Sequence, residues 1–214
     1  MKLPLTPVSA CYGYDRGTPV DRIYIDAFLA AHAHLITGDA AEIKDPTYLN
    51  HYGRHQLTST TVIDLDPGNP RATLIADITQ PAALPANAFD CIVLTQTLQL
   101  LADPAAALRT CATALRAGGT LLITAPSVAR ISPSAGPADR WRFTPSGLQH
   151  LLRDWPGPST VTAYGNLRTC LAALLGEAAQ ELTTTELDHH DPAFPLLTAA
   201  VARRHPATPS GGHP

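Results

Sequence analysis

The sequence predicts a single α/β domain built around a mainly parallel β-sheet. Short apolar runs of strand length alternate along the chain with segments in which apolar residues recur at helical spacing. Two of the runs, residues 89–95 (FDCIVLT) and 120–124 (TLLIT), are almost continuously apolar, which is typical of strands covered on both faces. Strands that alternate with helices pair in parallel through right-handed crossovers. At 214 residues the chain can bury one such core, and we expect the domain to span residues 1–204.

The first part of the chain predicts one helix and three strands ahead of the 89–95 run. Residues 20–35 (VDRIYIDAFLAAHAHL) place apolar side chains at helical spacing. Residues 40–43 are a weak, short strand, whereas residues 61–65 (TVIDL) are rich in β-branched side chains and predict a clearer one. Residues 72–76 (ATLIA) are a third candidate.

The second part of the chain continues the alternation. A helix is predicted at residues 103–115, with Asp103 as N-cap, Pro104 in the first turn, and Gly118 and Gly119 as the signal that ends it. The remaining predicted elements are the strand at 120–124, a short helix at 144–152, a strand at 159–164, an apolar helix at 167–181 and a last strand at 196–202.

Composition and charge exclude several classes of protein. The formal net charge is −3 and the longest Lys/Arg run is the pair Arg203 and Arg204, so a nucleic-acid partner is not expected. No stretch of about 18 apolar residues exists, so no membrane span is expected. The four cysteines are widely spaced without a CxxC pair, which predicts a reduced, cytoplasmic protein. The Pro- and Gly-rich tail, residues 205–214, is expected to be disordered.

Four motifs follow one another in the central part of the chain, and together they suggest a family. VIDLDPG is followed by LIADI, then by LPANAFDCIVLTQTLQLL, then by LRAGGTLLITAP. This succession resembles the class I S-adenosylmethionine-dependent methyltransferases, and GYDRGTPVDRIYIDAFL and ADRWRFTPSGLQHLL resemble small bacterial members of that group. The resemblance implies a three-layer Rossmann-like methyltransferase fold, with a mostly parallel seven-stranded sheet whose last strand is antiparallel. It also implies S-adenosylmethionine as cofactor.

The resemblance assigns cofactor contacts to the carboxyl ends of the predicted strands, where ligands of such sheets bind. Asp64 matches the acid that binds the ribose hydroxyls, since one carboxylate can accept from two hydroxyls, and Asp66 is its competitor. An acidic turn before Pro67 is the alternative role for these residues.

Four further residues are candidate cofactor contacts. Asp77, with Ile78, matches the position that contacts the adenine amino group, although a turn or helix-cap role fits Asp77 equally well. Thr95 and Gln96 end a wholly apolar strand, so we expect their polar side chains to face the cleft between cofactor and acceptor.

The sequence departs from the family at its first strand. The family pattern there is an acid followed by glycines, because a bare backbone can pack against the ligand and adopt positive φ. Here Glu42 is the acid, but Lys44 occupies the position of the first glycine in the family pattern. Pro46 occupies the position of the second glycine and has a fixed φ. Lys44 either pairs with the cofactor carboxylate or fills the pocket and excludes the cofactor.

Methyl transfer needs in-line positioning, plus a base where the acceptor must lose a proton. His51, His55 and Asp15 are the candidate bases. The i, i+4 spacing of the two histidines also occurs in metal sites, but no Glu follows His51 and Gly53 interrupts the segment, so no metal is expected. The candidate acceptor-binding residues are Tyr14, Arg16, Tyr48, Trp141 and Arg142, with the arm at residues 1–20 lying over the site.

Two functions remain open from the sequence. The first is S-adenosylmethionine-dependent methyl transfer to O or N of a small molecule, such as a sugar or a natural-product intermediate. The second is a non-methylating reaction on the same fold, such as cyclisation, elimination or isomerisation, which the altered glycine loop would favour. A non-enzymatic partner subunit is a third, weaker alternative. The expected partners are a small-molecule acceptor and a possible second copy in a homodimer.

Overall fold

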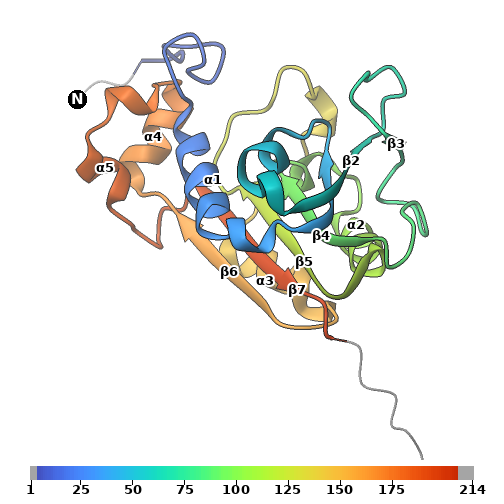
Figure 1. The fold of residues 1–214 in the computed structure, drawn as a ribbon. Helices are drawn as coiled ribbons and strands as arrows, with labels where there is room; N and C mark the ends of the chain where they lie inside the picture. The colour runs from blue at the N-terminus through green and yellow to red at the C-terminus, as the bar shows by residue number, and fades with distance from the viewer. Residues whose placement is uncertain (1–3, 207–214) are drawn as a thin grey trace, which may run out of the picture.

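The computed structural model describes residues 4–206 and contains one β-sheet flanked by helices (Figure 1). The strands are β1 (Gly38–Ile43), β2 (Leu57–Asp64), β3 (Leu74–Ile75), β4 (Phe89–Thr95), β5 (Leu115–Pro126), β6 (Ser159–Tyr164) and β7 (Leu197–Arg203). The α-helices are α1 (Val20–Ala31), α2 (Pro104–Ala114), α3 (Pro145–Leu151), α4 (Leu167–Leu175) and α5 (Thr184–Asp188).

The sheet has seven strands in the order β3-β2-β1-β4-β5-β7-β6. The pairs among β1 to β5 are parallel, whereas β7 pairs antiparallel with both β5 and β6. The strand order reverses between β1 and β4, which is where an open α/β sheet binds its ligands. The expected seven-stranded, mostly parallel sheet with an antiparallel last strand is confirmed.

Two hydrophobic cores, one on each face of the sheet, make the fold three-layered. On β4, Cys91 and Val93 point into the core covered by α1 and α4, whereas Ile92 and Leu94 point into the core covered by α2 and α3. Side chains of a strand alternate between faces, so an apolar run buries both faces at once. The continuous apolar character of the 89–95 run therefore results from its central place in the sheet.

The strands predicted at 89–95 and 159–164 are confirmed with those bounds, but β1, β2 and β5 begin earlier than predicted. β2 starts at Leu57 because its polar first residues pair with β1, so pairing rather than apolar pattern defines them. β5 starts at Leu115, directly after α2, with Leu115 opposite Phe89. Gly118 and Gly119 therefore lie inside β5, where Gly118 has φ +83°, and they do not end the helix as predicted.

The helix predicted at 167–181 is shorter than expected. α4 ends at Leu175 because Gly176 adopts the left-handed conformation with φ 77°. A Cβ at Gly176 would lie 2.7 Å from the Ser9 carbonyl oxygen, so the N-terminal arm packs against this turn. The chain resumes as a single 3-10 turn, Ala179–Glu181.

The described part of the arm, residues 4–19, is fastened to the end of α4. The amide of Val8 donates to the Leu175 carbonyl at 2.7 Å, and Pro19 forms an isolated bridge with Ala178. Most of the tail expected to be disordered, residues 207–214, lies outside the described residues. None of the helices within residues 4–206 combines the length and the apolar character that crossing a membrane requires.

Candidate functional site

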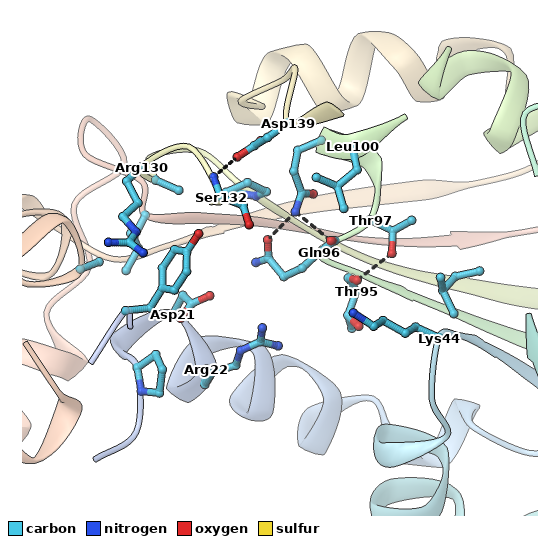
Figure 2. Close-up of a pocket in the computed structure, with 18 of the residues that line it drawn as sticks. Asp21, Arg22, Lys44, Thr95, Gln96, Thr97, Leu100, Arg130, Ser132 and Asp139 are labelled. Carbon is cyan, nitrogen blue, oxygen red and sulfur yellow. Dashed lines mark hydrogen bonds between the residues drawn. The ribbon is translucent and has the colours of Figure 1, made fainter. Parts of the chain in front are cut away.

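A cavity of about 550 Å³ opens at the carboxyl ends of β1, β2 and β4, where the strand order reverses (Figure 2). Its floor includes Ile43, Asp64 and Thr95, the last residues of those three strands. Tyr12 and Tyr14 of the arm form another part of the lining. The volume is within the range of small-molecule sites, about 300–1,000 Å³.

Lys44 holds the backbone conformation that the missing glycine would have adopted. Its φ is 75°, and the Asp45 amide donates across it to the Ile43 carbonyl at 3.0 Å, which makes a tight three-residue turn. The Lys44 amide is held by the Ile63 carbonyl of β2 at 2.8 Å. The side chain is exposed and, in Figure 2, extends along the cavity toward Thr95. The loop therefore makes a tight turn at Lys44 and places a cation in the cavity lining.

Glu42 closes the base of the same loop. Its two carboxylate oxygens accept from the amides of Tyr48 at 3.2 Å and Leu49 at 2.9 Å, so it fixes the start of the turn that follows the strand. The residue is 2% exposed, and burial raises the pKa of its carboxyl to about 7. Glu42 thus lies at the floor of the cavity as a structural acid.

Asp64 is available to a ligand at the end of β2. Asn69 donates to its Oδ2 at 2.6 Å and also to the Lys44 carbonyl at 2.7 Å, and the Asp66 amide donates to Oδ1 at 3.1 Å. These backbone and side-chain hydrogen bonds, together with the charge of Lys44, lower the pKa of Asp64 despite partial burial. Each oxygen keeps a second acceptor position, so the carboxylate can also receive two hydroxyls. Asp66 is exposed and does not line the cavity.

Asp77 and Ile78 lie outside the cavity lining. Asp77 accepts from the Thr79 amide at 2.9 Å and the Thr79 hydroxyl at 2.6 Å, which closes the turn after β3 and lowers its pKa. Ile78 is 5% exposed and belongs to the hydrophobic core. The turn role that the sequence left open for Asp77 is present, whereas a contact with adenine stays a prediction.

Thr95 and Gln96 both line the cavity, and Gln96 has a second glutamine beside it. Gln96 has φ 45° and its amide donates to the Thr124 carbonyl of β5 at 2.9 Å. Gln99 donates from Nε2 to the Gln96 carbonyl at 2.7 Å and to its Oε1 at 3.4 Å (Figure 2). The Gln96 Nε2 atom is buried and has no hydrogen-bond partner among the residues that the structure describes.

Arginines of α1 and of the segment after β5 also line the cavity. Arg22, on α1, donates to the Tyr48 hydroxyl at 2.9 Å. Arg130, from the segment after β5, stacks over the Tyr12 ring at 4.1 Å. Arg142 is bound to Asp139 of its own segment at 3.0 Å, and this pair lowers the pKa of Asp139.

Several predicted residues lie away from the cavity. His51 is exposed and lines a separate hollow with Asp26 and Tyr52, and His55 is exposed in the 3-10 turn Arg54–Gln56. The segment is a π-turn followed by a 3-10 turn rather than an α-helix, so the two histidines do not share an α-helical face.

The other predicted residues outside the lining have structural partners. Asp15 accepts from the Ser9 hydroxyl, and Arg16 forms an ion pair with Glu181 that fastens the arm. Trp141 is 43% exposed and donates to the Leu101 carbonyl at 2.8 Å. The cavity does bring together Tyr14, Tyr48 and Arg142 with five of the seven expected cofactor-binding residues, namely Glu42, Lys44, Asp64, Thr95 and Gln96.

Sequence reasoning missed several polar residues that line the cavity, among them Arg22, Gln99 and Arg130. Arg22 lies within the predicted first helix, outside its apolar stripe. Gln99 and Arg130 follow strands by several residues, so strand-end position did not select them. Among residues 4–206, no group of three or more His, Cys, Asp or Glu is placed to hold a metal ion.

Comparison with known proteins places this site in a family. Residues 26–169, about two thirds of the chain, match the family described as methyltransferase domain. A search of curated protein sequences finds no relative. Among solved structures, an S-adenosylmethionine-dependent methyltransferase from Mesorhizobium loti is similar with a TM-score of 0.61 and 17% identity, over 86% of this chain and 100% of that one.

Two other solved structures share the fold. The N-methyltransferase NodS from Bradyrhizobium japonicum, in complex with S-adenosyl-L-homocysteine, has a TM-score of 0.56 and 13% identity over 92% of this chain and 93% of that one. The [4+2]-cyclase SpnF has a TM-score of 0.55 and 18% identity over 89% and 85%. The expected family, enzyme class and S-adenosylmethionine cofactor are supported by these matches, and the chain belongs to the methyltransferase domain family.

Proposed function

We propose that this chain transfers a methyl group from S-adenosylmethionine to O or N of a small molecule, such as a sugar or a natural-product intermediate. The observation that carries the proposal is the cavity at the strand-order reversal, with Asp64 available at the end of β2. The cavity is lined in part by the arm and by the segment after β5, so it suits a small acceptor rather than a polymer.

The residues present fit the cofactor. Asp64 would accept from the ribose hydroxyls, because both of its oxygens keep an acceptor position. Lys44 and Arg22 line the same cavity and make no ion pair within 4 Å in the part of the chain that the structure describes. We propose that these two cations bind the cofactor carboxylate. When bound, the cofactor supplies an electrophilic methyl group on a sulfonium.

Asp21 is the residue that we propose as base. It lies at the start of α1, lines the cavity and forms no ion pair within 4 Å among residues 4–206. Burial raises the pKa of its carboxyl, which strengthens it as a proton acceptor. The bases expected from the sequence, His51, His55 and Asp15, do not line the cavity, so they are too far from an acceptor held inside it.

The second candidate function is a non-methylating reaction, and Lys44 is the observation that favours it. Its cationic side chain extends into the cavity where the family has a glycine (Figure 2). A sulfonium is itself a cation, so a nearby ammonium disfavours it relative to its neutral demethylated product. The similarity to SpnF, a cyclase on this fold, shows that the fold is compatible with such chemistry.

Calorimetric titration with S-adenosylmethionine and S-adenosylhomocysteine tests the proposal. We expect micromolar binding of both and a loss of about tenfold or more in Asp64→Ala, because the ribose hydroxyls lose their acceptor. Asp66→Ala is the matched control, because Asp66 is exposed and lies outside the cavity lining. This variant should bind S-adenosylmethionine and S-adenosylhomocysteine with the affinity of the parent chain. Absence of binding at millimolar cofactor would reject methyl transfer and leave the second candidate.

A further inference from the structure

Four residues that line the cavity each carry one buried polar atom that has no hydrogen-bond partner among residues 4–206. Three of these atoms are N–H donors, namely Arg22 Nε, Gln96 Nε2 and Arg130 Nε, and one is the acceptor Gln99 Oε1. Buried polar groups are nearly always satisfied, so unpartnered ones in a cavity indicate the polarity of what binds there. Donors outnumber acceptors by three to one, which predicts ligands rich in acceptor oxygens.

Arg130 is held in place by contacts with the arm. Its Nη2 donates to the Ala10 carbonyl and its guanidinium stacks on the Tyr12 ring. Neither contact neutralises its charge, and Arg130 forms no ion pair within 4 Å in the described chain. The Arg130 side chain is therefore an oriented cation whose Nε–H has no hydrogen-bond acceptor among the described residues. Oriented guanidinium groups bind carboxylate and phosphate oxygens in pairs of parallel hydrogen bonds.

Arg130 lies on the acceptor side of the cavity rather than on the cofactor side. The proposed cofactor contacts, Asp64 and Lys44, follow β2 and β1, whereas Arg130 follows β5, on the other side of β4. Gln96, at the end of β4, lies between these two groups in the strand order. Since Lys44 and Arg22 are the cations that we assign to the cofactor carboxylate, Arg130 remains for another ligand.

The nearest acid of the same segment does not compensate the charge of Arg130. Asp139 is bound by Arg142 Nη2 at 3.0 Å and by the Ser132 amide at 2.7 Å, and its side chain is 4% exposed. Asp139 and Arg142 therefore form an ion pair within the cavity wall, and the charge of Asp139 is compensated by Arg142. The wall carries one uncompensated positive charge at Arg130, which an anionic ligand group would neutralise.

We propose that the acceptor of this enzyme is an anion, with a carboxylate or phosphate group bound by Arg130 and a second oxygen receiving a hydrogen bond from Gln96 Nε2. The inference rests on the proposed function, since it names the class of molecule that occupies the acceptor side. It also assigns a specificity-determining role to the segment after β5.

Matched pairs of small probes test the inference on the full chain. Benzoate is compared with benzamide, and phenyl phosphate with phenol, by calorimetry with and without saturating S-adenosylhomocysteine. We expect each anion to bind at least about tenfold more tightly than its neutral partner. Tighter binding of benzoate would indicate a carboxylate acceptor, and tighter binding of phenyl phosphate would indicate a phosphate acceptor.

Variants separate the role of Arg130 from general effects of charge. Arg130→Gln should remove the preference for anions, and Arg130→Lys should keep part of it, because lysine retains the charge but not the paired donors. Arg109→Gln removes an exposed arginine from α2 and should leave the preference unchanged. The affinity for S-adenosylhomocysteine should stay within about twofold in all three.

Two results would overturn the inference. One is equal binding of anionic and neutral probes, or no binding of either at millimolar concentration. The other is an anion preference that survives in Arg130→Gln. Since the probes are titrated into free protein as well, these results are informative whether or not the cofactor binds. If the unmodified chain did not bind S-adenosylmethionine or S-adenosylhomocysteine, the proposed function would be rejected instead.

Discussion

Two residues that line the cavity, Lys44 and Gln96, hold a left-handed backbone that their side chains disfavour. Their φ angles are 75° and 45°, and they follow the neighbouring strands β1 and β4. Each such conformation costs about 1–2 kcal/mol and persists only where surrounding contacts enforce it. Here the amides donate to Ile63 and Thr124 on adjacent strands. The sheet therefore aims both polar side chains at the cavity.

Asp21 gives a prediction at the scale of a single residue. If Asp21 accepts the acceptor proton, Asp21→Asn should lower kcat by about 100-fold or more while leaving S-adenosylhomocysteine affinity unchanged. Burial raises the pKa of Asp21, and a base must be ionised to accept a proton. The activity of the parent chain should therefore rise as the pH increases through this raised pKa. The residual activity of Asp21→Asn should not show this rise. Methyl transfer from labelled cofactor to an acceptor found by screening provides the measurement.

Two residues that the sequence predicted as proton acceptors, His51 and Asp15, serve as controls for Asp21. His51→Gln and Asp15→Asn alter side chains outside the cavity lining, so both should retain the parent kcat. A large loss of kcat in either, with a normal Asp21→Asn variant, would assign the proton transfer elsewhere.

The loop between β1 and the π-turn Leu49–Gly53 is the element in which the chain departs most from its family. It keeps its shape through interactions with three neighbours: Asn69 binds its carbonyl at Lys44, β2 binds its amide, and Glu42 binds the amides at its end. These contacts fix the path of the loop, and Lys44 adds a positive charge to it.

Lys44→Gly tests what this loop does. The variant should bind S-adenosylmethionine about tenfold more weakly if the ammonium pairs with the cofactor carboxylate. Its free energy of unfolding should rise by up to about 1 kcal/mol, because glycine adopts positive φ without strain. Calorimetry and chemical denaturation provide the two measurements.

Lys44→Asn is the matched variant for this loop. Asparagine tolerates the left-handed conformation but carries no charge, so binding should weaken as in Lys44→Gly. Tighter cofactor binding in both variants would mean that Lys44 excludes the cofactor, which favours the non-methylating function.

At the scale of the whole molecule, the buried Glu42 makes stability depend on pH. The pKa of its carboxyl is about 7 in the folded chain, against 4.5 for the free group. Between these values the folded state holds more protons than the unfolded state, so the free energy of unfolding falls as pH rises from about 4.5 to about 7. The contribution is at most about 3 kcal/mol.

Chemical denaturation at several pH values measures this effect. Glu42→Gln should show a flatter profile than the parent chain in that window, because the amide does not ionise. Asp154→Asn, which alters a carboxylate whose side chain is 82% exposed, should leave the slope unchanged. A parent profile with the same slope as Glu42→Gln would contradict the proton uptake assigned to Glu42.

The sequence determined the sheet because local pattern and burial coincide there. The apolar run at Phe89–Thr95 follows from residue type and strand period alone. The family resemblance, which assigns cofactor contacts to the strand ends, found five cavity residues there: Glu42, Lys44, Asp64, Thr95 and Gln96. The boundaries of β2 and β5 were not found, because hydrogen bonding to neighbouring strands extends them through polar residues.

Only the tertiary structure decided which residues outside the strand ends share the cavity. Arg22, Gln99 and Arg130 come from a helix, a 3-10 turn and a loop, and no spacing in the sequence links them. His51, His55 and Trp141 had suitable chemistry, but the local chain direction places them outside. Pattern specifies which face of an element is buried, whereas the meeting of side chains from distant segments depends on how those elements pack.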